Sequence, residues 1–148
     1  MRPILVTACI AIASPALAET DISALIRDQG LAMAETTLAA LPDPTPAETF
    51  GLGGVRFLSG IETALQTRYR TGMAATAGLV DLPVLRLPIP ENPSPEPFTP
   101  ELIADLFTSV LADMEGAATT LDAAAGDFTV TIDTDDIWFD IDANGART

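Results

Sequence analysis

The residues with the most chemical potential lie near the C-terminus, in the stretch 133–145, which reads DTDDIWFDIDANG. This stretch contains five aspartates and the only tryptophan of the chain. The 148 residues contain no histidine and no lysine, and the one cysteine is Cys9. Within this sequence, these absences exclude an imidazole or thiolate zinc site, a Ser-His-Asp or Cys-His nucleophile, a lysine Schiff base and a P-loop. The chemistry that remains is the binding of hard cations by oxygen ligands, or hydrolysis by two carboxyl groups.

Residues 140–145 fit the pattern D-x-D-x-N-G and so resemble the first half of an EF-hand-type calcium loop. The resemblance implies three Ca²⁺ ligands at alternate positions, namely Asp140, Asp142 and Asn144. It also implies that Gly145 makes a sharp turn and that the carbonyl of Ala146 is the next ligand. The bidentate glutamate of a full loop would fall at position 151, three residues past Thr148, so without it we expect weak or no affinity. The alternative is an ordinary acidic Asn-Gly turn at the end of a strand.

The first 18 residues have the three-part pattern of a secretory signal peptide. A short basic start with Arg2 precedes an apolar run at 4–15, and small residues follow at 16–18. We therefore expect cleavage between Ala18 and Glu19 and a periplasmic or extracellular mature protein, the alternative being a buried N-terminal helix. The run is too short to span a membrane, and no later stretch comes closer. The net charge of −14 disfavours nucleic acid and anionic membrane surfaces as partners, because both bind Lys/Arg patches.

The elements that would position the acidic stretch are three amphipathic helices, expected at 21–40, from 46 to the glycine at 72, and from 100 to about 125. Each begins with a residue typical of an N-cap, namely Asp21, Thr45 and Thr99. Thr45 and Glu48 also have the spacing of a capping box.

Four glycines, Gly51, Gly53, Gly54 and Gly60, weaken the second helix by about 1 kcal/mol each relative to alanine. We expect that another helix, most simply the first, approaches closely at these positions.

A long connection at 73–98 separates the second and third helices and contains six prolines between 83 and 97. Proline at this density favours extended or polyproline II backbone. The apolar part at 79–89 is expected to lie across the helices as an ordered strap, whereas the more polar part at 90–97 is expected to be looser. A strap that covers core surface is favoured over one that docks a partner.

The apolar period changes to two after Gly126, which indicates β structure. Two alternating runs flank turn-forming residues at 134–136, with apolar side chains at Phe128, Val130, Ile132, Ile137, Phe139 and Ile141. Trp138 would then lie on the opposite face and cover another strand or a missing region. Because the sequence stops in the middle of a loop, we expect it to be the N-terminal portion of a longer exported protein.

These patterns predict a mainly α protein with three amphipathic helices, a long Pro-rich connection and a short C-terminal β-hairpin or strand. The expected units are a signal peptide at 1–18, a helical domain at 19–125 and a β segment with half a calcium loop at 126–148. The favoured function is a non-enzymatic, exported binding or structural module of unknown partner with a weak calcium-binding loop. The alternatives are the N-terminal part of a carboxylate-based hydrolase, or of another enzyme completed downstream, and an accessory protein for envelope transport.

Overall fold

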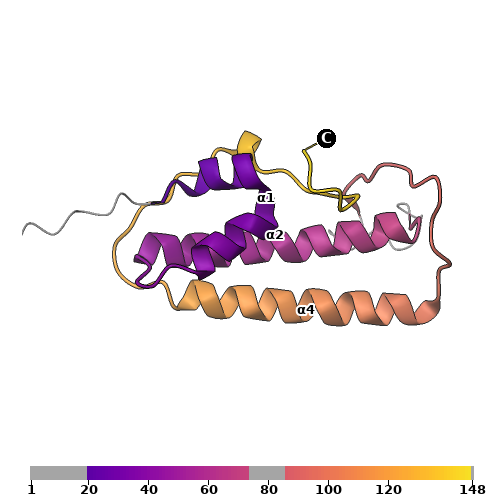
Figure 1. Ribbon diagram of the computed structural model, residues 1–148. Helices are drawn as coiled ribbons and strands as arrows, with labels where there is room; N and C mark the ends of the chain where they lie inside the picture. Colours follow the sequence, from indigo (N-terminus) through magenta and orange to yellow (C-terminus); the bar gives the residue numbers. More distant parts are fainter. Residues whose placement is uncertain (1–19, 74–85, 148) are drawn as a thin grey trace, which may run out of the picture.

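A computed structural model describes residues 20–73 and 86–147, and these residues are mainly helical. The long helices are α1 (Ile22–Ala39), α2 (Pro46–Arg70) and α4 (Pro100–Asp122), and a short 3-10 helix, η1, spans Thr134–Asp136. The prediction of a mainly α protein with three long helices is therefore confirmed for the described part of the chain (Figure 1). The predicted signal peptide at 1–18 lies outside the described residues, and no described helix has the length and apolarity to cross a bilayer.

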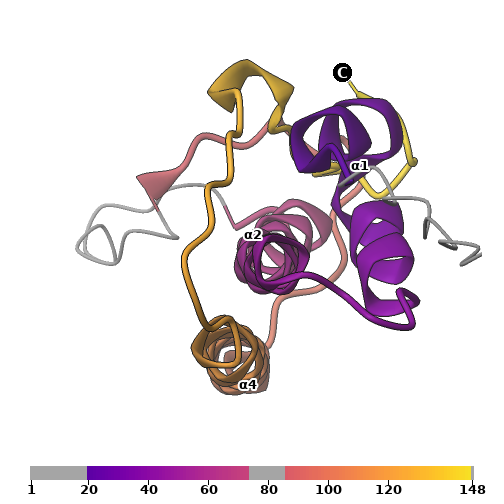
Figure 2. The ribbon, with the colours of Figure 1, turned by 90° about the vertical axis from the view of Figure 1, so that its left-hand side faces the viewer.

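Helix α2 is the centre of the arrangement, with α1 against one side and α4 against another (Figures 1 and 2). The main core forms between α1 and α2 and contains the buried side chains of Ile22, Leu25, Ile26, Leu31, Ala34, Leu38 and Val55. Helix α4 contributes only two buried apolar residues, Leu106 and Ala117. The two faces of α2 are thus covered unequally.

The helix starts follow the sequence signals in two of three cases. The capping box at α2 is complete, because the Thr45 hydroxyl accepts from the Glu48 N–H and the Glu48 carboxylate accepts from the Thr45 N–H. Asp21 caps α1 by accepting from the Ala24 N–H at 2.9 Å. Thr99 stands at the N-cap of α4 without a side-chain capping bond, so its predicted capping contact is absent there.

Helix α1 is broken at Gly30, which the apolar spacing did not predict. Gly30 has φ 75° and ψ 175°, a combination that side-chain-bearing residues rarely adopt. The break leaves carbonyls of the preceding turn without helical donors, and the indole N–H of Trp138 donates to those of Ile26 (3.0 Å) and Arg27 (3.3 Å). Trp138 therefore packs on the break in α1. The sequence had suggested instead that it covers another strand or a missing region.

The glycines of α2 mark close approach, as expected, but the neighbour is mostly α4. A Cβ atom on Gly53 would lie 2.7 Å from Leu121 Cγ and 3.0 Å from the Leu121 backbone nitrogen. A Cβ on Gly60 would lie 3.0 Å from the Asp113 Cβ, whereas only Gly51 faces α1. The prediction that the first helix approaches these glycines was therefore wrong for Gly53 and Gly60.

The predicted C-terminal β-hairpin is not found, because no described residue belongs to a strand. The alternating apolar side chains pack on helices instead of on a second strand: Val130, Ile132 and Phe139 lie against the α1–α2 core. Helix side chains also hold the backbone, since Ser23 Oγ accepts from the Asp133 N–H at 2.8 Å. Apolar and polar side chains that alternate along the chain indicate an extended segment with one face buried. They do not indicate whether a strand or a helix covers that face.

The Pro-rich connection is described from residue 86 onward, so most of the predicted strap at 79–89 lies outside the described residues. Its described part is mostly exposed and is fastened to the end of α2. The buried side chain of Arg68 donates to the Leu87 carbonyl at 2.9 Å, and the Asn92 amide donates to the Tyr69 carbonyl at 2.9 Å. Residues 90–97, predicted to be looser, thus have fixed contacts with the helix terminus.

Candidate functional site

The predicted calcium loop begins at Asp140, whose peptide group is held by two side chains of α2. The Asp140 N–H donates to Glu62 Oε2 at 2.7 Å, and the Asp140 carbonyl accepts from Gln66 Nε2 at 2.8 Å. Glu62 and Gln66 are four residues apart and therefore share one face of the helix. They fix the entrance of the loop to the helical bundle.

The three predicted ligands, Asp140, Asp142 and Asn144, come together in one curled turn. The two carboxylate oxygens of Asp140 accept from the Asn144 N–H (2.9 Å) and the Gly145 N–H (2.8 Å). Asp142 Oδ2 accepts from Asn144 Nδ2 at 2.8 Å, and Asn144 Oδ1 accepts from the Ala146 N–H at 2.7 Å. Gly145 has φ 79°, in agreement with the sharp turn predicted for it.

The side-chain oxygens of this loop thus accept hydrogen bonds from N–H groups of the loop itself. Within residues 20–73 and 86–147, no three histidine, cysteine or acidic side chains are grouped so that they could hold a metal ion. The loop offers two carboxylates and one amide, which are oxygen ligands of the kind that Ca²⁺ accepts. Binding would require at least some of these oxygens to exchange an N–H partner for the ion.

Glu62 is a functional candidate that the sequence reasoning missed. It is 8 % exposed, and burial raises the pKa of its carboxyl group, with a smaller contribution from the nearby Asp140 charge. The sequence did indicate that Glu62 is buried, because it lies four residues after Leu58 and three before Leu65, on the apolar stripe of the helix. A carboxyl with a raised pKa beside a second carboxylate suits acid–base chemistry, but Glu62 Oε2 already accepts the Asp140 N–H.

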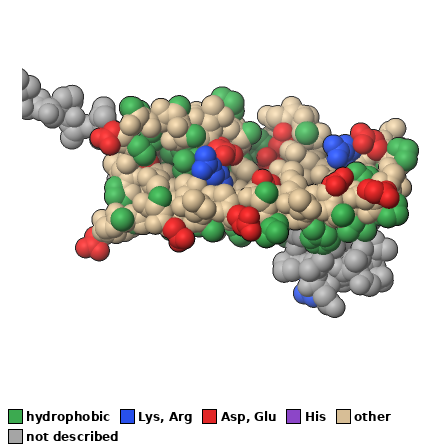
Figure 3. Space-filling view, turned by 90° about the horizontal axis from the view of Figure 1, so that it is seen from below, with side chains coloured by type: hydrophobic (Ala, Val, Ile, Leu, Met, Phe, Trp, Pro, Cys, Tyr) green, Lys and Arg blue, Asp and Glu red, His purple; other side chains and the backbone are tan. Residues whose placement is uncertain are grey.

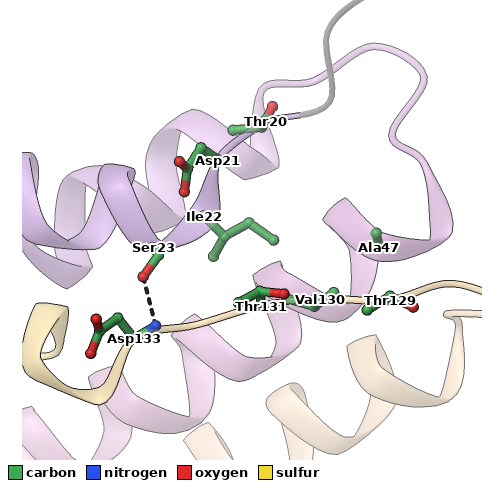
Figure 4. A pocket seen from close by; sticks show the side chains of 9 residues that line it. All are labelled: Thr20, Asp21, Ile22, Ser23, Ala47, Thr129, Val130, Thr131 and Asp133. Carbon is green, nitrogen blue, oxygen red and sulfur yellow. Dashed lines mark hydrogen bonds between the residues drawn. The ribbon is translucent and has the colours of Figure 1, made fainter.

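Two open cavities adjoin the C-terminal segment. One of about 300 Å³ lies between the loop and the end of α2 and is lined by Thr63, Gln66, Thr67, Tyr69, Arg70, Asn92, Ile141, Asp142 and Ala143. The other, of about 400 Å³, lies between the start of α1 and the extended chain before η1 (Figure 4). Its lining residues are Thr20, Asp21, Ile22, Ser23, Ala47, Thr129, Val130, Thr131 and Asp133.

The outer side of α4 exposes large apolar side chains among the described residues. Phe107 is 36 % exposed and Leu111 is 59 % exposed, and their spacing of four places them on the same side of the helix. Phe98, just before the helix, is 49 % exposed. Figure 3, which looks onto this side of the molecule, shows hydrophobic and acidic side chains next to each other.

The comparisons with known proteins identify no relative. No protein-family model matches the chain, and neither a curated protein nor a solved structure is significantly similar to it.

Proposed function

We propose that the protein is an exported binding or structural module that contacts a partner protein through the outer side of α4. The observation that carries this proposal is the one-sided packing of α4. The helix rests on α2 with Leu106 and Ala117, while Leu111 is well exposed and Phe107 lies partly exposed at the edge of the contact. Large apolar side chains gathered on a surface are typical of sites that contact another protein.

The charges around these side chains indicate the chemistry of the partner. Glu115 is exposed four residues after Leu111 and so shares that side of α4, and the chain as a whole carries a net charge of −14. A complementary surface would have an apolar centre with Lys or Arg at its rim. We prefer this function to a carboxylate-based hydrolase because Glu62, the carboxyl with the raised pKa, is buried and engaged by the backbone.

Crosslinking in the producing cell tests the proposal. A photoreactive amino acid at position 111 of the full chain is expected to yield one adduct of discrete mass. The same group at Ser109, which is exposed two residues away and so points elsewhere, is expected to yield none. Phe107→Ser should reduce the adduct from position 111. Because Phe107 is only 36 % exposed, the melting temperature of the variant is measured beside the parent, and crosslinking is carried out well below both melting temperatures. Equal crosslinking from both positions, or none from position 111, would contradict the proposal.

The second part of the proposal is that the 140–146 loop binds Ca²⁺ weakly. The support is that Asp140, Asp142 and Asn144 converge in one turn whose entrance is fixed to α2. We expect millimolar CaCl₂ to raise the melting temperature relative to EDTA, because an ion that binds only the folded state stabilises it by mass action.

The matched control for calcium is Asp142→Asn. It removes one charged ligand oxygen but leaves an oxygen to accept from Asn144 Nδ2. The variant should melt like the parent in EDTA and should show a smaller calcium response. If the parent melts at the same temperature in millimolar CaCl₂ and in EDTA, the loop is an acidic turn and not a metal site.

A further inference from the structure

In the extended chain before η1, residues 129–132 are alternately exposed and half-buried. Val130 and Ile132 pack against the α1–α2 core, whereas Thr129 and Thr131 are exposed. This is the alternation of a β-strand with one face covered. Phe128 fixes the beginning of the segment through a tilted contact with the ring of Phe50, with the ring centroids 5.4 Å apart.

The backbone of this segment is unpaired over several residues. At its end, the Asp133 N–H donates to Ser23 Oγ on α1. Among the residues that the structure describes, the N–H and C=O groups of 128–132 make no hydrogen bond to protein. In an extended chain, the N–H and C=O groups of every second residue point to the same edge. Because the N–H of Asp133 points towards α1, those of Thr131 and Thr129 point to that side as well.

The edge of Thr129 and Thr131 borders the cavity of about 400 Å³. Figure 4 shows this cavity between the segment on one side and Thr20–Ser23 on the other, with Ala47 at the end near Thr129. The contact between Ser23 and Asp133 closes the opposite end. Space and unpaired main-chain groups therefore coincide, which is the condition for adding a strand to an exposed edge.

We propose that this edge is a second binding site, which takes an extended segment of a partner protein by β-augmentation. The guest strand forms main-chain hydrogen bonds with Thr129 and Thr131 and lies in the cavity beside the start of α1. This site is separate from the α4 surface and does not depend on the function proposed for that surface.

Charge determines which strand fits. The lining of the cavity includes Asp21 and Asp133 and no basic residue, so the guest carries arginine or lysine at its ends. A second copy of this chain is a poor guest. Antiparallel pairing of the segment with itself about Val130 would place Asp127 opposite Asp133, and like charges in that position destabilise a strand pair.

The test uses the full mature chain and a blocked synthetic peptide of about six residues, with alternating valine and threonine and an arginine at each end. Titration followed by fluorescence anisotropy of the labelled peptide should show saturable binding. The same peptide with N-methyl groups on alternate residues, which removes the edge-facing donors, should bind at least about tenfold more weakly. Replacement of both arginines by glutamate should likewise weaken binding.

Amide hydrogen exchange locates the contact within the protein. The bound parent peptide should slow exchange at Thr129 and Thr131, whereas the Val130 N–H, which faces the opposite edge, should be unaffected. Thr131→Pro should abolish binding, and Thr131→Ala, which keeps the backbone donor, should retain it. The peptide series and the exchange experiment test the parent chain even if Thr131→Pro folds poorly.

Three outcomes would overturn the proposal. The first is equal binding of the N-methylated and parent peptides, and the second is protection of Val130 in place of its two neighbours. The third is a concentration-dependent dimer of the protein alone that Thr131→Pro abolishes, which would make a second copy the occupant.

Discussion

Glu48 and Glu62 are both nearly buried on α2, yet their environments act in opposite directions. Hydrogen bonds donated by Thr20 and Thr45 lower the pKa of Glu48, with the Thr20 hydroxyl giving the largest effect. Burial raises the pKa of Glu62, against the single N–H of Asp140 that favours its charged form. One carboxyl is therefore held as an anion, and the other is costly to ionise.

The two pKa shifts predict opposite pH dependences. Glu48, with its lowered pKa, contributes stability above its unfolded pKa, and this contribution is lost as the pH falls through the folded pKa. Glu62 has a raised pKa, so its ionisation destabilises the fold as the pH rises from the unfolded pKa through the folded one. At pH 7 we expect Glu48→Gln to lower the free energy of unfolding by about 1–2 kcal/mol. Both carboxylate oxygens of Glu48 accept hydrogen bonds, whereas the glutamine amide has only one oxygen.

The paired variant Glu62→Gln should raise the free energy of unfolding at pH 7, since its carbonyl can still accept from Asp140 without burying a charge. Urea unfolding at pH 3, pH 5 and pH 7 would measure both variants. The wild-type advantage over Glu48→Gln should persist at pH 5, which is above the unfolded pKa, and should shrink at pH 3 as the pH falls towards the lowered folded pKa. The advantage of Glu62→Gln should already shrink at pH 5, because its raised pKa keeps more of the carboxyl protonated there. A loss of stability in Glu62→Gln at both pH 5 and pH 7 would show that the charge itself is needed.

At the scale of elements, the glycines of α2 set the distance between helices. The Gly53 site has no room for a methyl group, because both the side chain and the backbone of Leu121 are in the way. At Gly54, the next residue, no heavy atom of another element lies within 4 Å of the position that an added Cβ atom would occupy. Neighbouring glycines of the same helix therefore have different reasons to be there.

Alanine substitutions separate these two roles. Gly53→Ala should cost about 1–3 kcal/mol of unfolding free energy, because α4 must move outwards. Gly54→Ala should increase stability by about 0.4–1 kcal/mol, because alanine restricts the unfolded chain and favours a helix. Urea unfolding of the two variants beside the parent measures both effects. Equal effects of the two substitutions would mean that α2 and α4 are not in close contact at Gly53.

The elements that could be predicted were those with a local physical cause. The capping box of Thr45 and Glu48 and the proline starts of α2 and α4 act within one helical turn, and they placed the helices correctly. The carbonyls freed at the Gly30 break find their donor in Trp138, more than a hundred residues later, so no local window contains that contact. The predicted hairpin was wrong because alternation shows which side chains are buried but not whether a strand or a helix covers them.

The turn at 140–146, which the calcium proposal uses, was predictable to a similar extent. Asp140, Asp142 and Asn144 do converge, since D-x-D-x-N-G is itself a local turn pattern. Their attachment through Glu62 and Gln66 is a contact between distant elements, and the sequence did not indicate it. The free edge at Thr129 and Thr131 could not be predicted either, because it exists only where an expected partner strand is missing.

At the scale of the whole molecule, export is the proposal that is easiest to check. Intact mass spectrometry of the protein recovered from the periplasm of the producing cell should give a chain that begins at Glu19. Ala18→Leu should remain uncleaved and associated with the membrane, because signal peptidase requires a small residue at that position. Recovery of the parent from the cytosol with residues 1–18 intact would contradict export.

Trp138 has a consequence for the order of folding. The hydrogen bond from its indole to the Ile26 carbonyl joins residues 112 positions apart, and Ser23 reaches Asp136 over 113. Contacts with such large sequence separation raise the contact order of an otherwise helical chain, and high contact order slows folding. A ribosome or a translocon releases the N-terminus first, so we expect the carbonyls at the break in α1 to gain their indole partner only after residue 138 has emerged. On this expectation, the first helix to appear is the last to be completed.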